Sequence, residues 1–148
     1  MREKCTDSEW TTLQYSPLWV FAGVAAIDGK IDEKEAAALL KELYEAGLYK
    51  SDLAREIFGS VAGNLSALHA PFRADGRNLV DGLRQVKDIL AKYCTPKDAN
   101  DYKQALVLLG KNIASASGGG GIFKKKSPIS DKEMAALVAI MAVLDIQT

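Results

Sequence analysis

The sequence predicts an all-α fold, a single compact bundle of about six or seven helices. Apolar residues recur at spacings of three and four over most of the chain. Glycine, proline and helix-capping residues separate these stretches, and no window alternates apolar and polar residues as a strand would. The length of 148 residues suits one domain, so we expect residues 1–148 to form a single unit.

The first half of the chain predicts four helices, at residues 6–15, 17–27, 33–46 and 51–68. Thr6 or Asp7 caps the first, and Pro17 opens the second behind a Ser16 cap. The second is apolar on nearly every side, which indicates a central, buried helix. A loop is expected over residues 69–76, because Pro71 and the Asp75-Gly76 pair favour turns.

The second half predicts helices at residues 77–94, 96–116 and 131–145. Thr95 is the expected cap before Pro96. Residues 118–128 read as a Gly-rich and basic linker inside the domain. The residues after this linker are too few to form a core alone, so the last helix must dock on the others. Its apolar character predicts a second central helix beside 17–27.

Composition excludes several classes of function. Nineteen basic and nineteen acidic residues cancel, which argues against nucleic acid as the main partner. The run Met134–Leu144 is shorter than the roughly 20 apolar residues of a membrane span, and no transmembrane segment is expected. The N-terminus has no apolar signal segment, so we expect a cytoplasmic protein.

The reactive side chains are few and do not form a catalytic motif. His69 is the single histidine, and no Ser-His or Cys-His motif surrounds it. Cys5 and Cys94 lack the spacing of a zinc site. Two reduced thiols are the default expectation for this pair, with a disulfide left open. We therefore predict a protein that is not an enzyme.

Two acidic stretches at predicted helix starts are the candidate functional residues. The first acidic elbow contains Asp28 in an Asp-Gly turn, Asp32 as a helix cap and Glu35 at the third helical position. The second acidic elbow contains Asp131 and Glu133, after the Ser130 cap. Five carboxylates offer the oxygen ligands that Ca²⁺ or Mg²⁺ prefers.

The two elbows belong to an internal echo. Residues 31–39 align without gaps to residues 129–137 and share an isoleucine, a lysine, a glutamate, two alanines and a leucine. This predicts a duplicated helix-turn unit packed about a pseudo-twofold axis. Such packing would bring the two helix starts together and let their acids share one cation.

A structural explanation competes with the metal site. Capping accounts for Asp32 and Glu35, and the turn accounts for Asp28, without any ligand. An EF-hand is excluded, because Val24 and Ala26 occupy its first and third ligand positions.

The two elbow segments resemble the TerB-like, tellurite-resistance family. Its pattern is an apolar helix ending in Asp-Gly, then x-Ile-x-x-x-Glu, as in residues 28–35. A Gly-rich stretch before a last Ile-Ser-x-x-Glu helix matches residues 118–121 and 129–133. The second elbow departs from the pattern, because residues 126–128 are Lys-Ser-Pro where Asp-Gly would stand. This departure favours one shared metal site over two.

The resemblance implies an all-helical fold and a non-enzymatic role in bacterial stress response. It also implies divalent-cation binding by the elbow acids, and protein partners in a membrane-associated stress complex. Such a protein would be cytoplasmic, at the periphery of the inner membrane. The alternative is a structural protein–protein interaction module without metal, whose apolar docking surface includes Ile122 and Phe123.

Overall fold

The computed structural model describes residues 1–24, 45, 50–117 and 131–146. Within these ranges the chain forms five α-helices, one short 3-10 helix and no strand. In chain order they are η1 (Arg2–Lys4), α1 (Asp7–Val24), α3 (Asp52–Ala74), α4 (Leu79–Tyr93), α5 (Pro96–Ser117) and α6 (Asp131–Leu144). The all-α prediction is confirmed. The expected helix at 33–46 and the first copy of the echo lie outside the described residues, so the pseudo-twofold repeat stays a prediction.

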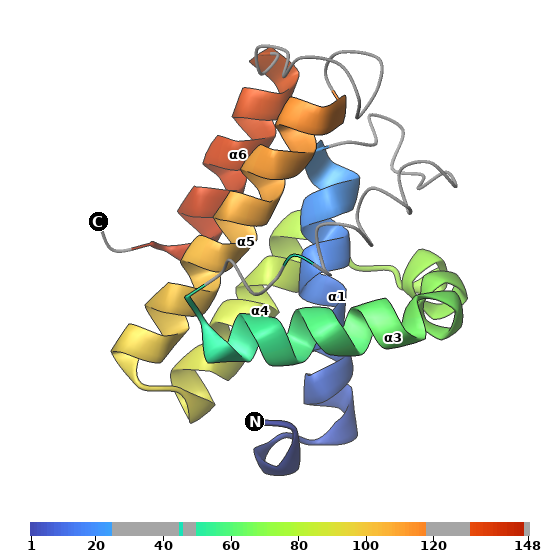
Figure 1. The fold of residues 1–148 in the computed structure, drawn as a ribbon, viewed down its shortest axis with the longest axis vertical. Coiled ribbons are helices and arrows are strands. Elements are labelled where there is room, and N and C mark those ends of the chain that lie inside the picture. Colours follow the sequence, from blue (N-terminus) through green and yellow to red (C-terminus); the bar gives the residue numbers. More distant parts are fainter. Residues whose placement is uncertain (25–44, 46–49, 118–130, 147–148) are drawn as a thin grey trace.

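Helix α1 lies in the middle of the bundle and contacts α3, α4, α5 and α6 (Figure 1). Its apolar side chains point in every direction, and most of them are buried. The largest are Trp10, Leu13, Tyr15, Leu18, Trp19 and Phe21. Burial of apolar surface on all sides is the main stabilising contribution that one helix makes to such a bundle.

Pro17 lies inside α1, so the prediction of two helices meeting at this proline was wrong. Pro17 lacks the N–H that would reach the Leu13 carbonyl four residues earlier. The Ser16 hydroxyl donates a hydrogen bond to that same carbonyl oxygen at 2.6 Å. The residue expected to cap a new helix therefore replaces the bond that the proline removes, and the helix continues.

A capping box starts α1. The Thr6 hydroxyl accepts the Glu9 N–H at 3.1 Å, and the Glu9 carboxylate accepts the Thr6 N–H at 2.9 Å. The same carboxylate accepts hydrogen bonds from the Tyr93 hydroxyl at 2.6 Å and the Lys92 ammonium at 3.1 Å. Glu9 thus joins the start of α1 to the end of α4.

This arrangement predicts an acid-sensitive contribution to stability. The Thr6 N–H, followed by the Tyr93 hydroxyl, lowers the pKa of Glu9 from 4.5 to about 2. A folded-state pKa below the unfolded value stabilises the fold above about pH 4.5, and this is lost as the pH falls toward 2. In urea unfolding, wild type should exceed Glu9→Gln in stability at pH 7, and the gap should close near pH 2. A gap that is independent of pH would contradict this assignment.

Helix α3 begins where the sequence predicts and ends later. The Ser51 hydroxyl caps it by accepting the Ala54 N–H at 3.0 Å. The backbone leaves helical geometry at Asn64 (φ −132°, ψ 19°), and a second helical piece then runs on to Ala74. The loop expected at 69–76 was therefore wrong over most of its length, because helix continues through Pro71 and turns only after Ala74.

The starts of α4 and α5 follow their capping residues. The Asn78 side chain accepts the Asp81 N–H at 2.8 Å, and the Thr95 hydroxyl accepts the Asp98 N–H at 3.1 Å. The Thr95 cap before Pro96 is therefore confirmed. Tyr102 of α5 is fully buried.

Helix α6 lies alongside α5 (Figure 1) and also contacts α1 and α4. Its buried residues are Leu137, Ile140 and Leu144. Met134 and Val138 remain 46% and 52% exposed, so the expectation of a second central helix was wrong. One side of α6 packs on the bundle and the other faces outward.

Among the described residues, no helix is long and apolar enough to cross a membrane.

Candidate functional site

Only the second acidic elbow lies among the described residues. Asp28, Asp32 and Glu35 lie outside them. Asp131 and Glu133 occupy the first turn of α6, as expected, with Asp131 exposed and Glu133 half-buried. Within the described part of the chain, no group of three or more His, Cys, Asp or Glu side chains is placed to hold a metal ion. The shared cation site therefore remains a prediction.

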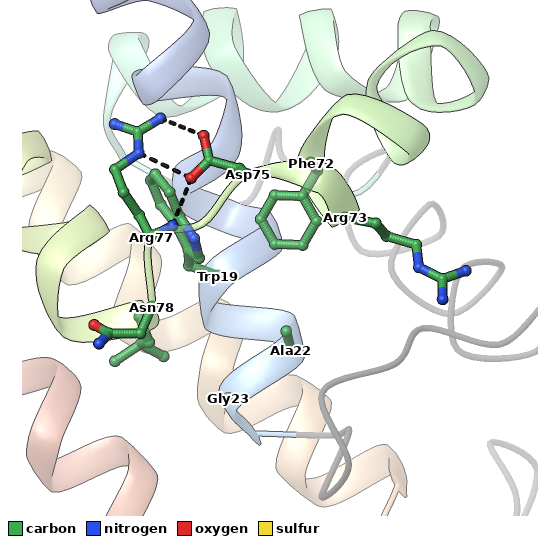
Figure 2. A pocket seen from close by; sticks show the side chains of 9 residues that line it. Trp19, Ala22, Gly23, Phe72, Arg73, Asp75, Arg77 and Asn78 are labelled. Atoms are coloured by element: carbon green, nitrogen blue, oxygen red, sulfur yellow. Dashed lines mark hydrogen bonds and ion pairs between the residues drawn. The ribbon is translucent and has the colours of Figure 1, made fainter.

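A hollow of about 410 Å³ opens where α1, α3 and α4 meet (Figure 2). Trp19, Ala22 and Gly23 come from α1, and Phe72 comes from the end of α3. The polar lining comes from the end of α3, the connection to α4 and the cap of α4, namely Arg73, Asp75, Arg77 and Asn78. Leu79 completes the wall. The connection between α3 and α4 was predicted as a turn, but nothing in its sequence indicated a hollow.

Arg77 holds this junction together. Its Nε and one terminal nitrogen bind the two carboxylate oxygens of Asp75 at 3.0 and 2.9 Å (Figure 2). The other terminal nitrogen donates to the Thr12 hydroxyl at 3.0 Å and to the Gln85 side-chain oxygen at 2.6 Å. The guanidinium carbon lies 4.9 Å from the centre of the Trp19 ring. One cation therefore ties the α3–α4 connection to α1 and α4.

The electrostatics agree with a closed structural pair. Hydrogen bonds from Arg77 hold the pKa of Asp75 below its ordinary value. Burial, followed by the charge of Asp75, raises the pKa of Tyr15. Tyr15 packs edge-on against both Trp19 and Phe72, with ring centres 5.6 and 5.3 Å apart. Asp75 and Arg77 are bound to each other, so the remaining lining of the hollow combines apolar side chains with Arg73 and Asn78.

This role predicts a clear cost for Arg77→Lys. Lysine keeps the charge but loses the two-pronged contact with Asp75 and the planar stacking on Trp19. We expect the free energy of unfolding to fall by about 1–3 kcal/mol. Chemical denaturation would measure it, with Arg84→Lys as the control. Arg84 is 61% exposed and lies 3.7 Å from Asp81, so its change should cost less than about 0.5 kcal/mol. Equal losses would contradict the role of Arg77.

The outer face of α6 is a second candidate surface. It consists of the exposed residues Met134, Ala135, Val138 and Ala142. Their spacing of one and four residues places them within one arc of the helix. No charged residue interrupts the sequence from Met134 to Leu144, while Asp131 and Glu133 lie at its start. The sequence signalled an apolar helix, but not that one face of it would stay exposed.

Within the described residues, fold and surfaces define an all-helical protein with a central α1, a hollow of mixed polarity at the α1–α3–α4 junction and an apolar outer face on α6. The chain is 31% identical over 148 residues to the uncharacterized protein ORF11' of Methanothermobacter thermautotrophicus. The match covers 97% of this chain and 92% of the archaeal protein. The chain belongs to the same family as this archaeal protein. No family model and no solved structure matches it.

Proposed function

We propose that this chain is a non-enzymatic, TerB-like stress-response protein that docks a partner protein through the outer face of α6. The observation that carries the proposal is the exposure of Met134 and Val138 on a helix without charges from 134 to 144. Apolar side chains that share one exposed helix face are typical of surfaces that bind proteins. It takes up the interaction module named above as the alternative, and we propose α6 as its docking surface. The Ile122-Phe123 segment named for it lies outside the described residues.

The chemistry of the face specifies the partner. Met134, Val138 and the two alanines suit an apolar groove, and the small alanines allow a close approach. The exposed Asp131 at the start of the same helix favours a basic side chain at one end of that groove. The partner is therefore an apolar surface with a basic residue at one end.

Site-specific photo-crosslinking would test this docking. A photoreactive residue at Val138 should give a crosslinked product of defined mass in cells, and Met134→Asp in the same chain should abolish it. The matched control places the photoreactive residue at Leu108 of α5, which is 41% exposed. Equal products at both positions, or none at Val138, would overturn the proposal. A product of twice the mass of the chain would identify a second copy as the partner.

A divalent cation at the acidic elbows is the second proposal. It is supported by Asp131 and Glu133, which occupy the first turn of α6 as the resemblance implies. The ligands would be Asp28, Asp32 and Glu35 with these two acids, and the cation Ca²⁺ or Mg²⁺. Calorimetric titration of the chelator-treated protein should show binding that Asp28→Ala combined with Glu35→Ala removes. Absence of binding heat in the wild type would overturn the proposal of a cation site and would not affect the docking proposal.

A further inference from the structure

The two cysteines lie at one end of an antiparallel pair of helices. Near its C-terminus α1 packs closely against the start of α4, where a Cβ built on Gly23 would overlap Leu79 Cδ1. At the other end, Glu9 at the start of α1 accepts the Tyr93 hydroxyl at the end of α4. The start of α1 therefore lies beside the end of α4.

Cys5 and Cys94 flank this second junction. Cys5 precedes Thr6, the cap of α1, and Cys94 follows Tyr93 as the C-cap of α4. The Glu9 carboxylate binds both the Thr6 N–H and the Tyr93 hydroxyl. One side chain thus connects the residue after Cys5 with the residue before Cys94.

The environment of the two thiols is shared and reachable. Both are free, half-buried and packed against the same core. Cys94 lines a second hollow of about 390 Å³ together with Met1 and Lys4, the neighbour of Cys5. Burial is the main cause that raises the pKa of each thiol, and Cys5 is among the groups that raise the pKa of Cys94. Both thiols are therefore protonated at neutral pH, and the fraction of thiolate that can attack a disulfide grows as the pH rises.

We infer that Cys5 and Cys94 form a thiol-oxidation site, in which an oxidising disulfide such as oxidised glutathione joins them in one intramolecular bond. One protein thiolate attacks oxidised glutathione, forms a mixed disulfide and releases one glutathione. The second thiolate then attacks the protein sulfur of that mixed disulfide and releases a second glutathione. The protein loses two protons and two electrons, and one oxidised glutathione becomes two reduced molecules.

The bond would tie the N-terminal segment to the end of α4. It would close a loop of roughly 90 residues, which restricts the unfolded chain strongly. Through this restriction we expect the oxidised protein to melt about 10 °C above the reduced protein. In the oxidised protein the N-terminal segment would be held to α4 by a covalent bond as well as by packing.

The experiment treats the full chain with oxidised glutathione at pH 8.5 and follows thiol alkylation by mass spectrometry. The reduced protein should carry two alkyl groups. The oxidised monomer should carry no alkyl group. Before alkylation, its mass should be two hydrogens below that of the reduced protein. Peptide mapping should join Cys5 to Cys94, and thermal melting should show the rise in Tm.

Two variants keep the inference falsifiable. Cys5→Ser and Cys94→Ser should each retain one thiol and show no rise in Tm, with circular dichroism confirming that they fold. Glutathione adducts that persist on both cysteines of the wild type would overturn the inference. So would disulfide-linked dimers in place of the linked monomer, or alkylation that oxidised glutathione leaves unchanged.

Discussion

Replacement of Gly82 by alanine should lower the free energy of unfolding by about 2 kcal/mol, because overpacking a filled core costs about 1–3 kcal/mol. A Cβ on Gly82 would lie 2.5 to 2.6 Å from three ring carbons of Trp19. Trp19 is only 3% exposed, and its ring is held by Arg77 and the aromatic rings of Tyr15 and Phe72. The ring cannot shift without losing these contacts, so the added methyl group must push α4 away from α1.

Gly59→Ala provides the matched control in urea or thermal unfolding. Gly59 also lies inside a helix, and a Cβ there would have no atom within 4 Å. Alanine is the better helix former by about 1 kcal/mol, so this variant should gain stability. The two substitutions are chemically identical and should have opposite signs. A gain at Gly82 would show that the space beside Trp19 yields easily.

The second large effect concerns the buried hydroxyl pair of Ser16 and Tyr102. Their oxygens lie 2.6 Å apart. Ser16 already donates its single proton to the Leu13 carbonyl, so Tyr102 must be the donor to Ser16. Ser16→Ala removes one oxygen and leaves two buried groups without partners, the Tyr102 hydroxyl and the Leu13 carbonyl. Each orphaned group costs about 1–3 kcal/mol, so we expect a loss of about 2–6 kcal/mol.

Tyr102→Phe should cost less, about 1 kcal/mol, because Ser16 keeps its bond to Leu13. The double variant should cost less than the sum of the two single variants, since phenylalanine leaves no orphaned hydroxyl. A double-mutant cycle by urea denaturation measures this coupling. Equal single losses, or strict additivity, would contradict the assigned direction of the hydrogen bond.

Local rules in the sequence predicted much of the fold. Thr95 marked the start of α5 and caps it with its side chain as expected, and the helix expected from residue 51 begins at Asp52 behind a Ser51 cap. Apolar residues on all sides of residues 17–24 predicted the central position of the second half of α1. These features depend on neighbours along the chain, and a sequence displays such neighbours directly.

Local rules failed at the two prolines that lie inside helices. Pro17 reads as a helix start, yet Ser16 restores the hydrogen bond at Leu13 and the helix continues. Pro71 likewise lies within α3 rather than in a loop. Whether a proline ends a helix thus depends on whether another group forms the hydrogen bond that the proline cannot donate.

Local patterns in the amino-acid sequence were enough to predict the helical class and most helix starts. Which helix faces are covered depends on the packing of the helices against one another. Residues 134–144 read as a buried helix, but α6 meets its neighbours on one side and leaves Met134 and Val138 exposed. Arg77 lies at the centre of the α1–α3–α4 junction. Its partners Thr12 and Gln85 are 65 and 8 residues away in the sequence, so local spacing does not reveal these hydrogen bonds. Burial and long-range hydrogen bonds depend on how helices pack, and local spacing does not encode that packing.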